Sequence, residues 1–300
     1  MAPQTREHGD RHQPGPKIRY ILAPNPSMMT QNGTNTYLLG SGRVAVIDPG
    51  PADDRHLAAI LAALSPNETI SHIFVTHTHL DHSGLVGQLA QRTGSRTYGF
   101  GPATAGRSIA MGRLSEKLSL GGGEGVDHDF NPDVCLADGD QVIGEDWSLV
   151  ALHTPGHLGN HLCFACDDIL FSGDHVMGWS TSLISPPDGD MTDYMASLRK
   201  VSERNWQRFL PGHGSPVLKP ALRLAELIAH RKAREAALLS ALGARVTDIA
   251  ALVRAVYPDL GANLVPAAKR NCLAHLIDLE GRNLIKATPF IGPDAFFTLL

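Results

Sequence analysis

The sequence predicts an α/β protein built from sheets with covering helices, followed by a smaller helical unit. Over residues 18–219, apolar runs rich in β-branched residues alternate with amphipathic runs of helical period, a pattern typical of sheets covered by helices. Four of the apolar runs end at histidine or aspartate, where layered α/β folds carry their sites. After residue 219 the helical period takes over, which predicts a separate second unit.

The first elements follow from local patterns. Residues 53–65 carry apolar side chains on one face, with Asp53 or Asp54 as the candidate N-cap, and residues 83–94 predict a helix that Gly94 ends. Apolar runs bounded by Gly and Pro predict strands at 17–23, 35–40, 43–50 and 72–77. The α/β prediction depends on this alternation.

The region after residue 100 is less regular. Residues 101–132 begin with a helical pattern and end in the Gly-rich run GGGEG, residues 121–125. This run follows no strand, so it does not predict a phosphate-binding loop. We expect a mobile flap near a site instead.

The C-terminal residues predict three helices and one strand. The helices are expected at 220–243, at 246–260 with Thr247 as N-cap, and at 265–281, and the strand at 283–290. Small helices followed by a strand are compatible with a winged-helix-like unit. We therefore divide the chain into a disordered lead-in over 1–17, a main domain over 18–219 and a winged-helix-like domain over 220–300.

The composition is that of a globular protein in water, with 43% hydrophobic and 19% charged residues. No apolar run is long enough to cross a membrane and no secretory signal is recognisable, so we expect a cytoplasmic protein without a membrane partner. Residues 1–219 hold 16 Lys and Arg against 23 Asp and Glu, whereas residues 220–300 hold 10 against 7. Either both are solvated surfaces, or the C-terminal unit meets an anionic partner.

The four cysteines do not form a recognisable disulfide framework. Cys163 and Cys166 form a C-x-x-C inside a strand-like run, and residues three apart on a strand point to opposite faces. We therefore expect these two side chains to pack in the core and not to share a metal ion.

The stretch THTHLDHSG, residues 76–84, holds four ionisable groups in six positions. His77 and His79 are two apart at a strand end, so their side chains point the same way. Asp81 and His82 follow in the turn before a helix. Burying so many ionisable groups is costly without a bound ion, and convergent imidazoles and carboxylates are ligands for divalent metals. The stretch predicts a metal site.

Three later strand ends repeat this arrangement. His157 stands in HTPGH, Asp174 in FSGD and His213 in PGHG, each at or just beyond an apolar run. Glycines beside these residues allow the tight backbone that turns a side chain inward. These three residues are therefore further candidate ligands.

In this order, the H-x-H-x-D-H run, HTPGH, FSGD and PGHG resemble the motifs of the metallo-β-lactamase superfamily. The resemblance covers about residues 18–219 and implies a four-layer αββα fold with two divalent metal ions. It assigns His77, His79 and His157 to the first ion, and Asp81, His82 and His213 to the second. It also implies that Asp174 bridges the two ions and that Asp48, in VIDPG, supports the ligands from behind.

Within the superfamily, the β-lactamase-like protein 2 group is the nearer match. The similarity rests on LFSGDHVMGWSTS (170–182), DYMASLRKV (193–201) and HRKARE (230–235). Members of that group carry a C-terminal winged-helix-like domain, which agrees with the helices expected here. The common periplasmic zinc β-lactamases have a cysteine where this chain has Asp174 and are exported, so the native role is not expected to be β-lactam hydrolysis.

The resemblance implies a mechanism. Two cations about 3.5–4 Å apart lower the pKa of a bridging water, and the resulting hydroxide attacks a carbonyl or phosphorus centre. Asp81 is the expected catalytic residue, because it can both ligate and orient the nucleophile. A ligand set of His and Asp suits zinc first, and manganese or iron as alternatives.

Three further histidines lie close to the candidate ligands in sequence, and Tyr194 opens a later helix. We expect His153 and His175 to donate hydrogen bonds to ligands or backbone and not to bind metal. His161 either faces the substrate or packs behind the ligands. Tyr194 either lines the pocket or packs in the core.

The preferred function is hydrolysis of a small ester or thioester by the bridging hydroxide. A single-strand-specific endoribonuclease is the first alternative, motivated by the positive C-terminal unit and the group resemblance. Iron-dependent sulfur oxidation, which related folds perform, is another. A non-catalytic nucleic-acid-binding module with a structural metal is the last, and the complete ligand set argues against it.

Overall fold

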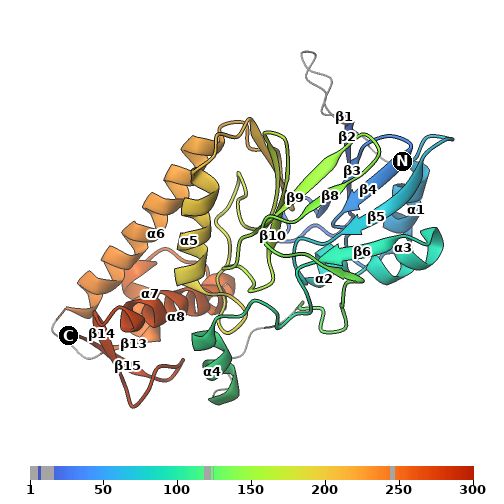
Figure 1. Cartoon of the computed structure of the whole chain (residues 1–300). Coiled ribbons are helices and arrows are strands. Elements are labelled where there is room, and N and C mark those ends of the chain that lie inside the picture. Colours follow the sequence, from blue (N-terminus) through green and yellow to red (C-terminus); the bar gives the residue numbers. More distant parts are fainter. Residues whose placement is uncertain (1–5, 8–16, 118–122, 124, 244–246) are drawn as a thin grey trace.

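The computed structural model describes residues 6–7, 17–117, 123, 125–243 and 247–300. Nearly all of the expected lead-in over residues 1–17, and most of the expected flap over residues 121–125, lie outside the described residues. Two sheets face each other, with helices on their outer sides and further helices at the C-terminal end (Figure 1).

The first sheet has seven strands among the described residues, and they follow one another in chain order. The first four strands pair antiparallel and the last four pair parallel. Helices α1 (Asp54–Ala62), α2 (Leu80–Ser83) and α3 (Val86–Thr93) follow its strands β4 and β5. The strands are β1 (Arg6–Glu7), β2 (Ile18–Leu22), β3 (Asn35–Leu39), β4 (Arg43–Ile47), β5 (Thr69–Phe74), β6 (Arg96–Gly99) and β7 (Val134–Cys135).

The second sheet has five strands in the order β12-β11-β10-β9-β8. Only β11 and β12 pair parallel, because helix α5 (Met191–Ser202) lies between them in the chain. The strands are β8 (Gln141–Ile143), β9 (Ser148–His153), β10 (Leu162–Cys166), β11 (Ile169–Gly173) and β12 (Arg208–Pro211).

The space between the two sheets is filled by aromatic side chains. Phe74 of the first sheet meets Phe164 of the second with ring centroids 5.2 Å apart. Tyr37 and Phe171 pair across the same interface, also at 5.2 Å. Such pairs add specific geometry to the burial of apolar area. The two sheets are therefore packed face to face over one shared core.

The outer face of each sheet is covered by helices. Ile60 of α1 and Leu89 of α3 pack on the first sheet, and Leu198 of α5 packs on the second. The order helix, sheet, sheet, helix confirms the four-layer prediction. Cys163 belongs to the outer cluster and Cys166 to the core between the sheets, so the pair points to opposite faces as its spacing predicts.

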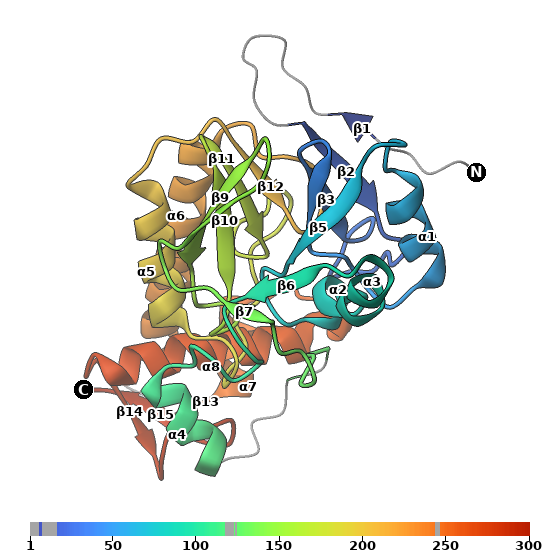
Figure 2. The same cartoon turned by 45° about the vertical axis from the view of Figure 1, so that its right-hand side comes forward.

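The C-terminal end forms a helical unit with a small sheet. Helices α7 (Ile249–Val256) and α8 (Val265–Gly281), with a short 3₁₀ turn at Ala262–Leu264 between them, pack on each other and on α6 (Pro220–Leu242). Figure 2 shows α7 and α8 below the second sheet, and α4 (Ile109–Lys117) in front of them. The sheet has the order β13-β15-β14, with β13 at Thr247–Asp248, β14 at Ile285–Thr288 and β15 at Phe296–Leu299.

Two details of this unit differ from the sequence predictions. Thr247 is not the N-cap of α7; Asp248 is, and its Oδ1 accepts from the amide of Ala251 at 2.7 Å. Thr247 instead pairs with Phe297 of β15, a strand that the sequence did not indicate. Local patterns miss such pairings because the partner lies far along the chain.

Helix α6 contacts both parts of the molecule (Figure 1). Leu224 and Leu227, in its first half, pack with α5 on the second sheet. Leu238 and Leu242, at its end, pack with α7 and α8. The domain boundary after residue 219 stays a prediction. Among the described helices, none has the length and apolar character needed to span a bilayer.

Candidate metal centre

The predicted ligands stand on loops that leave the strands at the same end of both sheets. His77 and His79 follow β5, His157 follows β9, Asp174 follows β11 directly, and His213 follows β12. Apolar residues of each strand are buried in the core, whereas the polar residues beyond the strand ends lie close to one another. The structure brings all of these side chains together.

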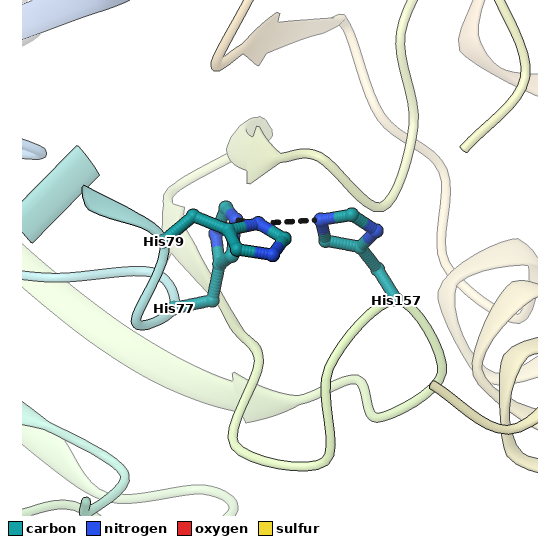
Figure 3. Close-up of side chains that lie close together, drawn as sticks. All are labelled: His77, His79 and His157. Carbon is teal, nitrogen blue, oxygen red and sulfur yellow. Dashed lines mark hydrogen bonds between the residues drawn. The ribbon is translucent and has the colours of Figure 1, made fainter. Parts of the chain in front are cut away.

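The first group is a triad of imidazoles from His77, His79 and His157. His79 Nδ1 lies 2.9 Å from His77 Nε2 and 3.0 Å from His157 Nε2. Figure 3 shows the three rings turned toward one another, with the dashed line joining His79 and His157. Three ring nitrogens therefore converge on one point.

The hydrogen bonds behind the triad decide which nitrogens carry protons. His157 Nδ1 donates to the carbonyl of Leu183 at 2.7 Å. His77 Nδ1 lies 3.0 Å from Thr76 Oγ1, which itself donates to Asp48, so His77 is the donor. The Nε2 atoms of His77 and His157 then hold lone pairs, and His79 has one proton to offer them. At least one buried lone pair needs a cation, so the donor set fits a metal ion.

The second group contains Asp81, His82 and His213. Asp81 Oδ2 lies 3.2 Å from His213 Nε2 and 3.7 Å from His82 Nε2. The two Nε2 atoms are 3.3 Å apart. His213 Nδ1 donates to the carbonyl of Gly33 at 3.2 Å, which turns its Nε2 into the group. This donor set also fits a divalent ion.

Asp174 lies between the two groups. Its Oδ2 is 3.4 Å from His213 Nε2 and 3.8 Å from His157 Nε2. Its Oδ1 is 3.6 Å from His82 Nε2 and has no hydrogen-bond partner among the described residues, although it is buried. A buried carboxylate oxygen without a donor suits contact with a cation. Asp174 thus lies within 4 Å of ligand candidates from both groups.

The electrostatics of the two groups differ. Burial holds the pKa of His77 well below its usual value and lowers that of His79 to about 3, because nearby carboxylates oppose it only weakly. Burial also opposes the charged form of His213, but Asp174 and Asp81 outweigh it and raise the pKa to about 9. The pKa of His82 is likewise held high by Asp81, Asp174 and Asp48 against its burial.

Asp48 supports the second group from behind. Its Oδ2 accepts from His82 Nδ1 at 2.9 Å and from Thr76 Oγ1 at 2.8 Å, while its Oδ1 accepts from the Thr76 amide at 2.7 Å. Asp48 has a positive φ of 52°, a conformation that few non-glycine residues adopt. One carboxylate therefore fixes the ring of His82 and the start of the loop that carries His77.

The remaining predicted residues lie behind the ligands. His153 Nε2 donates to the carbonyl of Gly159 at 2.8 Å, and its ring stacks on Phe100. His161 Nδ1 lies 2.9 Å from Thr154 Oγ1, and its ring packs against that of His77. Neither belongs to a metal-binding group among the described residues.

His175 and Tyr194 form a second buried pair. The hydroxyl of Tyr194 donates to the His175 carbonyl at 3.2 Å, and the two rings pack with centroids 5.1 Å apart. Tyr194 is fully buried, which places it in the core and not on an open pocket wall. His175 is also buried, and burial lowers its pKa to about 3. Its side chain is therefore neutral at pH 7.

The sequence did not reveal the backbone groups that orient the ligands. The carbonyls of Leu183 and Gly33 each accept from a ligand histidine, and a carbonyl has no residue-type signal. Thr34 was also missed; its hydroxyl donates to Asp81 Oδ2 at 3.4 Å. A threonine directly before a strand is too common to be recognised.

Comparison with known proteins agrees with this geometry. Residues 29–213 match the family model of the metallo-beta-lactamase superfamily. The chain belongs to the metallo-β-lactamase superfamily. Residues 249–289 match the beta-lactamase associated winged helix domain, so the C-terminal winged-helix prediction is confirmed. Members of this superfamily are hydrolases that bind divalent metals, and the chain is an enzyme of this class.

Two curated relatives and one solved structure extend the comparison. The beta-lactamase-like protein 2 homolog of Drosophila melanogaster is 32% identical and covers 89% of both chains, which confirms the predicted group. An atrochrysone carboxyl ACP thioesterase of Passalora fulva is 28% identical over 94% of this chain and 79% of its own length. A beta-lactamase domain protein from Burkholderia ambifaria shares the fold with a TM-score of 0.80 at 21% identity, over 100% of this chain and 94% of that one.

Proposed function

We propose that this protein hydrolyses an ester or thioester carbonyl at a dinuclear metal centre. The observation that carries the proposal is the convergence of two ligand groups on either side of Asp174. Structural zinc sites are almost always closed by four protein ligands around the ion, whereas catalytic sites keep an open position. Two adjoining groups that share a carboxylate favour catalysis over a structural role.

The chain's own residues divide the work. His77, His79 and His157 would hold one ion, and Asp81, His82 and His213 the other, with zinc the first choice and manganese or iron possible by ligand type. When bound, two such ions supply an acidified water and polarise the substrate carbonyl. The Asp81 side chain is 29% exposed whereas that of Asp174 is 10% exposed. Asp81 is therefore the carboxylate best placed to orient a water and take its proton.

Charge favours an acyl substrate over a nucleic acid. Residues 1–219 hold 16 Lys and Arg against 23 Asp and Glu, and a net negative catalytic part repels a polyanion. Trp179 is exposed and lies against the backbone of Gly214, the residue after His213. An apolar ring beside the ligands suits an acyl chain. The relative named as an ACP thioesterase supports the thioester over the oxygen ester.

A substrate panel tests the proposal. Metal-free protein is reconstituted with Zn²⁺, Mn²⁺ or Fe²⁺ and assayed with short acyl thioesters, oxygen esters and single-stranded RNA. We expect thioester turnover that Asp81→Ala lowers by about a hundredfold or more, the range typical of a lost general base. Asp54→Ala, which removes an exposed carboxylate in α1, should leave turnover unchanged. RNA cleavage that depends on Asp81, without thioester turnover, would replace the proposal with a nuclease.

A further inference from the structure

Arg231, in α6, is a buried cation without a carboxylate partner among the described residues. It is 1% exposed and is the largest of the fully buried side chains. Its Nη2 donates to the carbonyl of Ser182, and its Nη1 donates to Asn271 Oδ1 at 3.0 Å. A buried charge is costly when only neutral oxygens receive it. The position of this guanidinium therefore calls for a functional reason.

The first reason lies in the residue that follows Ser182. The carbonyl of Leu183 accepts from His157 Nδ1 at 2.7 Å, and this bond turns His157 Nε2 toward the first triad. The carbonyls of residues 182 and 183 belong to adjoining planar peptide units. Holding the Ser182 carbonyl therefore fixes the position of the Leu183 Cα, from which the peptide unit with the second carbonyl extends. Arg231 thus acts on the bond that orients a ligand.

The second reason lies at the start of the same loop. The guanidinium of Arg231 stands over the ring of Tyr194 at 5.1 Å, and the Tyr194 hydroxyl donates to the carbonyl of His175. His175 follows Asp174 directly. Arg231 therefore contacts the segment 174–183 directly at Ser182 and reaches its other end through Tyr194. The segment begins at one predicted ligand and ends at the support of another.

A neighbouring arginine strengthens the same connection. Arg223, two turns earlier in α6, donates from Nε to the carbonyl of Met177 at 2.8 Å and from Nη2 to that of Ser180 at 2.7 Å. Charged donors to carbonyls form strong hydrogen bonds. Helix α6 thus holds the segment 174–183 at residues 177, 180 and 182.

We propose that Arg231 is a positioning residue for the first metal triad, which it reaches through the Leu183 carbonyl and His157. Through Asn271 of α8, the same guanidinium ties the C-terminal helices to the metal centre. The inference rests on the proposed function, because it requires an ion bound by His157. It predicts that a change in the C-terminal unit alters the affinity for one ion and not for the other.

The chain offers a matched control in the same helix. Arg234 also places its guanidinium over an aromatic ring, that of Tyr257, at 4.5 Å. It also donates to a backbone carbonyl, that of Val256, at 2.9 Å. Its partners lie in the C-terminal unit and not on the segment 174–183. Arg234→Met therefore removes an equivalent interaction without touching the metal centre.

Zn²⁺ titration of the metal-free full chain tests the inference. Arg231→Met should lower the affinity for one of the two ions by about tenfold, which is the lower end of the range for residues that orient ligands. Arg231→Lys keeps a donor and should recover part of the loss, and Arg234→Met should bind like the wild type. Combined with His157→Ala, Arg231→Met should cause no further loss, because both act on the same ion. A general loss of packing would instead lower the affinity for both ions, and Arg231→Met would still lower the affinity when combined with His157→Ala.

Several outcomes would overturn the inference. The inference is contradicted if Arg231→Met binds Zn²⁺ with unchanged affinity, or if Arg234→Met loses as much affinity as Arg231→Met. It is also contradicted if Arg231→Met lowers the affinity further when combined with His157→Ala. If Arg231→Met does not fold, Arg231→Lys and Asn271→Ala are compared, and unchanged affinity in both contradicts it. If the wild type binds two ions and the Arg231 and Asn271 variants bind them with wild-type affinity, the inference fails but the proposed function stands. If the wild type binds no ion, both proposals fail.

Discussion

The two ligand groups of the metal centre differ in charge although they lie side by side. The first contains only imidazoles, and burial keeps the pKa of His77, His79 and His157 below the usual value. The second contains Asp81, and the neighbouring carboxylates raise the pKa of His82 and His213 against their burial. Without metal, the first group is neutral, whereas protons occupy the second.

This difference means that two ions bound by these groups would not be equivalent. The first group presents lone pairs and can accept a cation without losing a proton. The second must exchange its protons for the cation, so its affinity depends on pH. Asp174 belongs to both groups through the distances from its two oxygens. The variants described next change one of the two groups, or Asp174, which lies close to both.

Loss of the shared carboxylate is expected to have the largest effect. Asp174→Ala should lower turnover by about a thousandfold, because several kcal/mol of transition-state stabilisation depend on the ions. It should also lower the affinity for both ions in a Zn²⁺ titration. A variant that keeps one ion at wild-type affinity would show that Asp174 serves a single site.

Asp48→Asn acts first on the second group, because Asp48 contacts His82 directly and reaches His77 only through Thr76. Asp48 fixes His82 through its Oδ2, and loss of such a partner costs about 10–100-fold in metal affinity. Asparagine tolerates the positive φ of residue 48, so the fold should be kept. The affinity for an ion held by His77, His79 and His157 should fall less, because Asp48 reaches that group only through Thr76. Equal weakening of both ions would remove the distinction between the groups.

Gly212→Ala applies steric pressure to the second group. A Cβ at residue 212 would lie 2.5 Å from His82 Cε1 and 2.6 Å from Asp174 Oδ1. We expect metal affinity to fall by roughly tenfold, within the range for displaced ligands. Gly87→Ala, in α3, is the control, since a Cβ there meets no atom within 4 Å. It should raise the free energy of unfolding by about 0.5–1 kcal/mol. Unaltered metal binding in Gly212→Ala would contradict the geometry.

The smallest expected effect is on the metal-free protein. The folded pKa of His213 is about 9, against about 6.5 when unfolded. The stability that His213 contributes is therefore complete below about pH 6.5 and is lost as the pH rises through about 9. Chelator-treated protein should lose roughly 5 °C in Tm over this interval, and His213→Asn should flatten the change. A Tm that rises with pH over this interval would contradict the assignment.

The sequence indicated the candidate ligands because they lie at or beyond the ends of apolar strands. His77, Asp174 and His213 stand where strands of both sheets end together, and the pattern of a strand survives in a single sequence. The α/β class and the helices α1, α3, α6 and α8 followed from the same periodicities, whereas the four-layer order was implied by the family resemblance.

The unpredicted features depend on tertiary contacts. The carbonyls of Leu183 and Gly33 orient two ligands through bonds that span 26 and 180 residues of the chain. Arg231 lies in a helix rich in charged residues, where an arginine normally faces water. Its burial arises because α6 lies on the loop after β11. Such contacts leave no local pattern.

The most direct test is the zinc stoichiometry of the full chain. Metal-free wild type, His157→Ala and His213→Ala are titrated with Zn²⁺ at pH 7.5, and bound zinc is measured after removal of free metal. We expect two ions per wild-type chain and one in each variant, with proton release accompanying only the ion that His157→Ala retains. A single ion in the wild type, or two ions in either variant, would contradict this expectation.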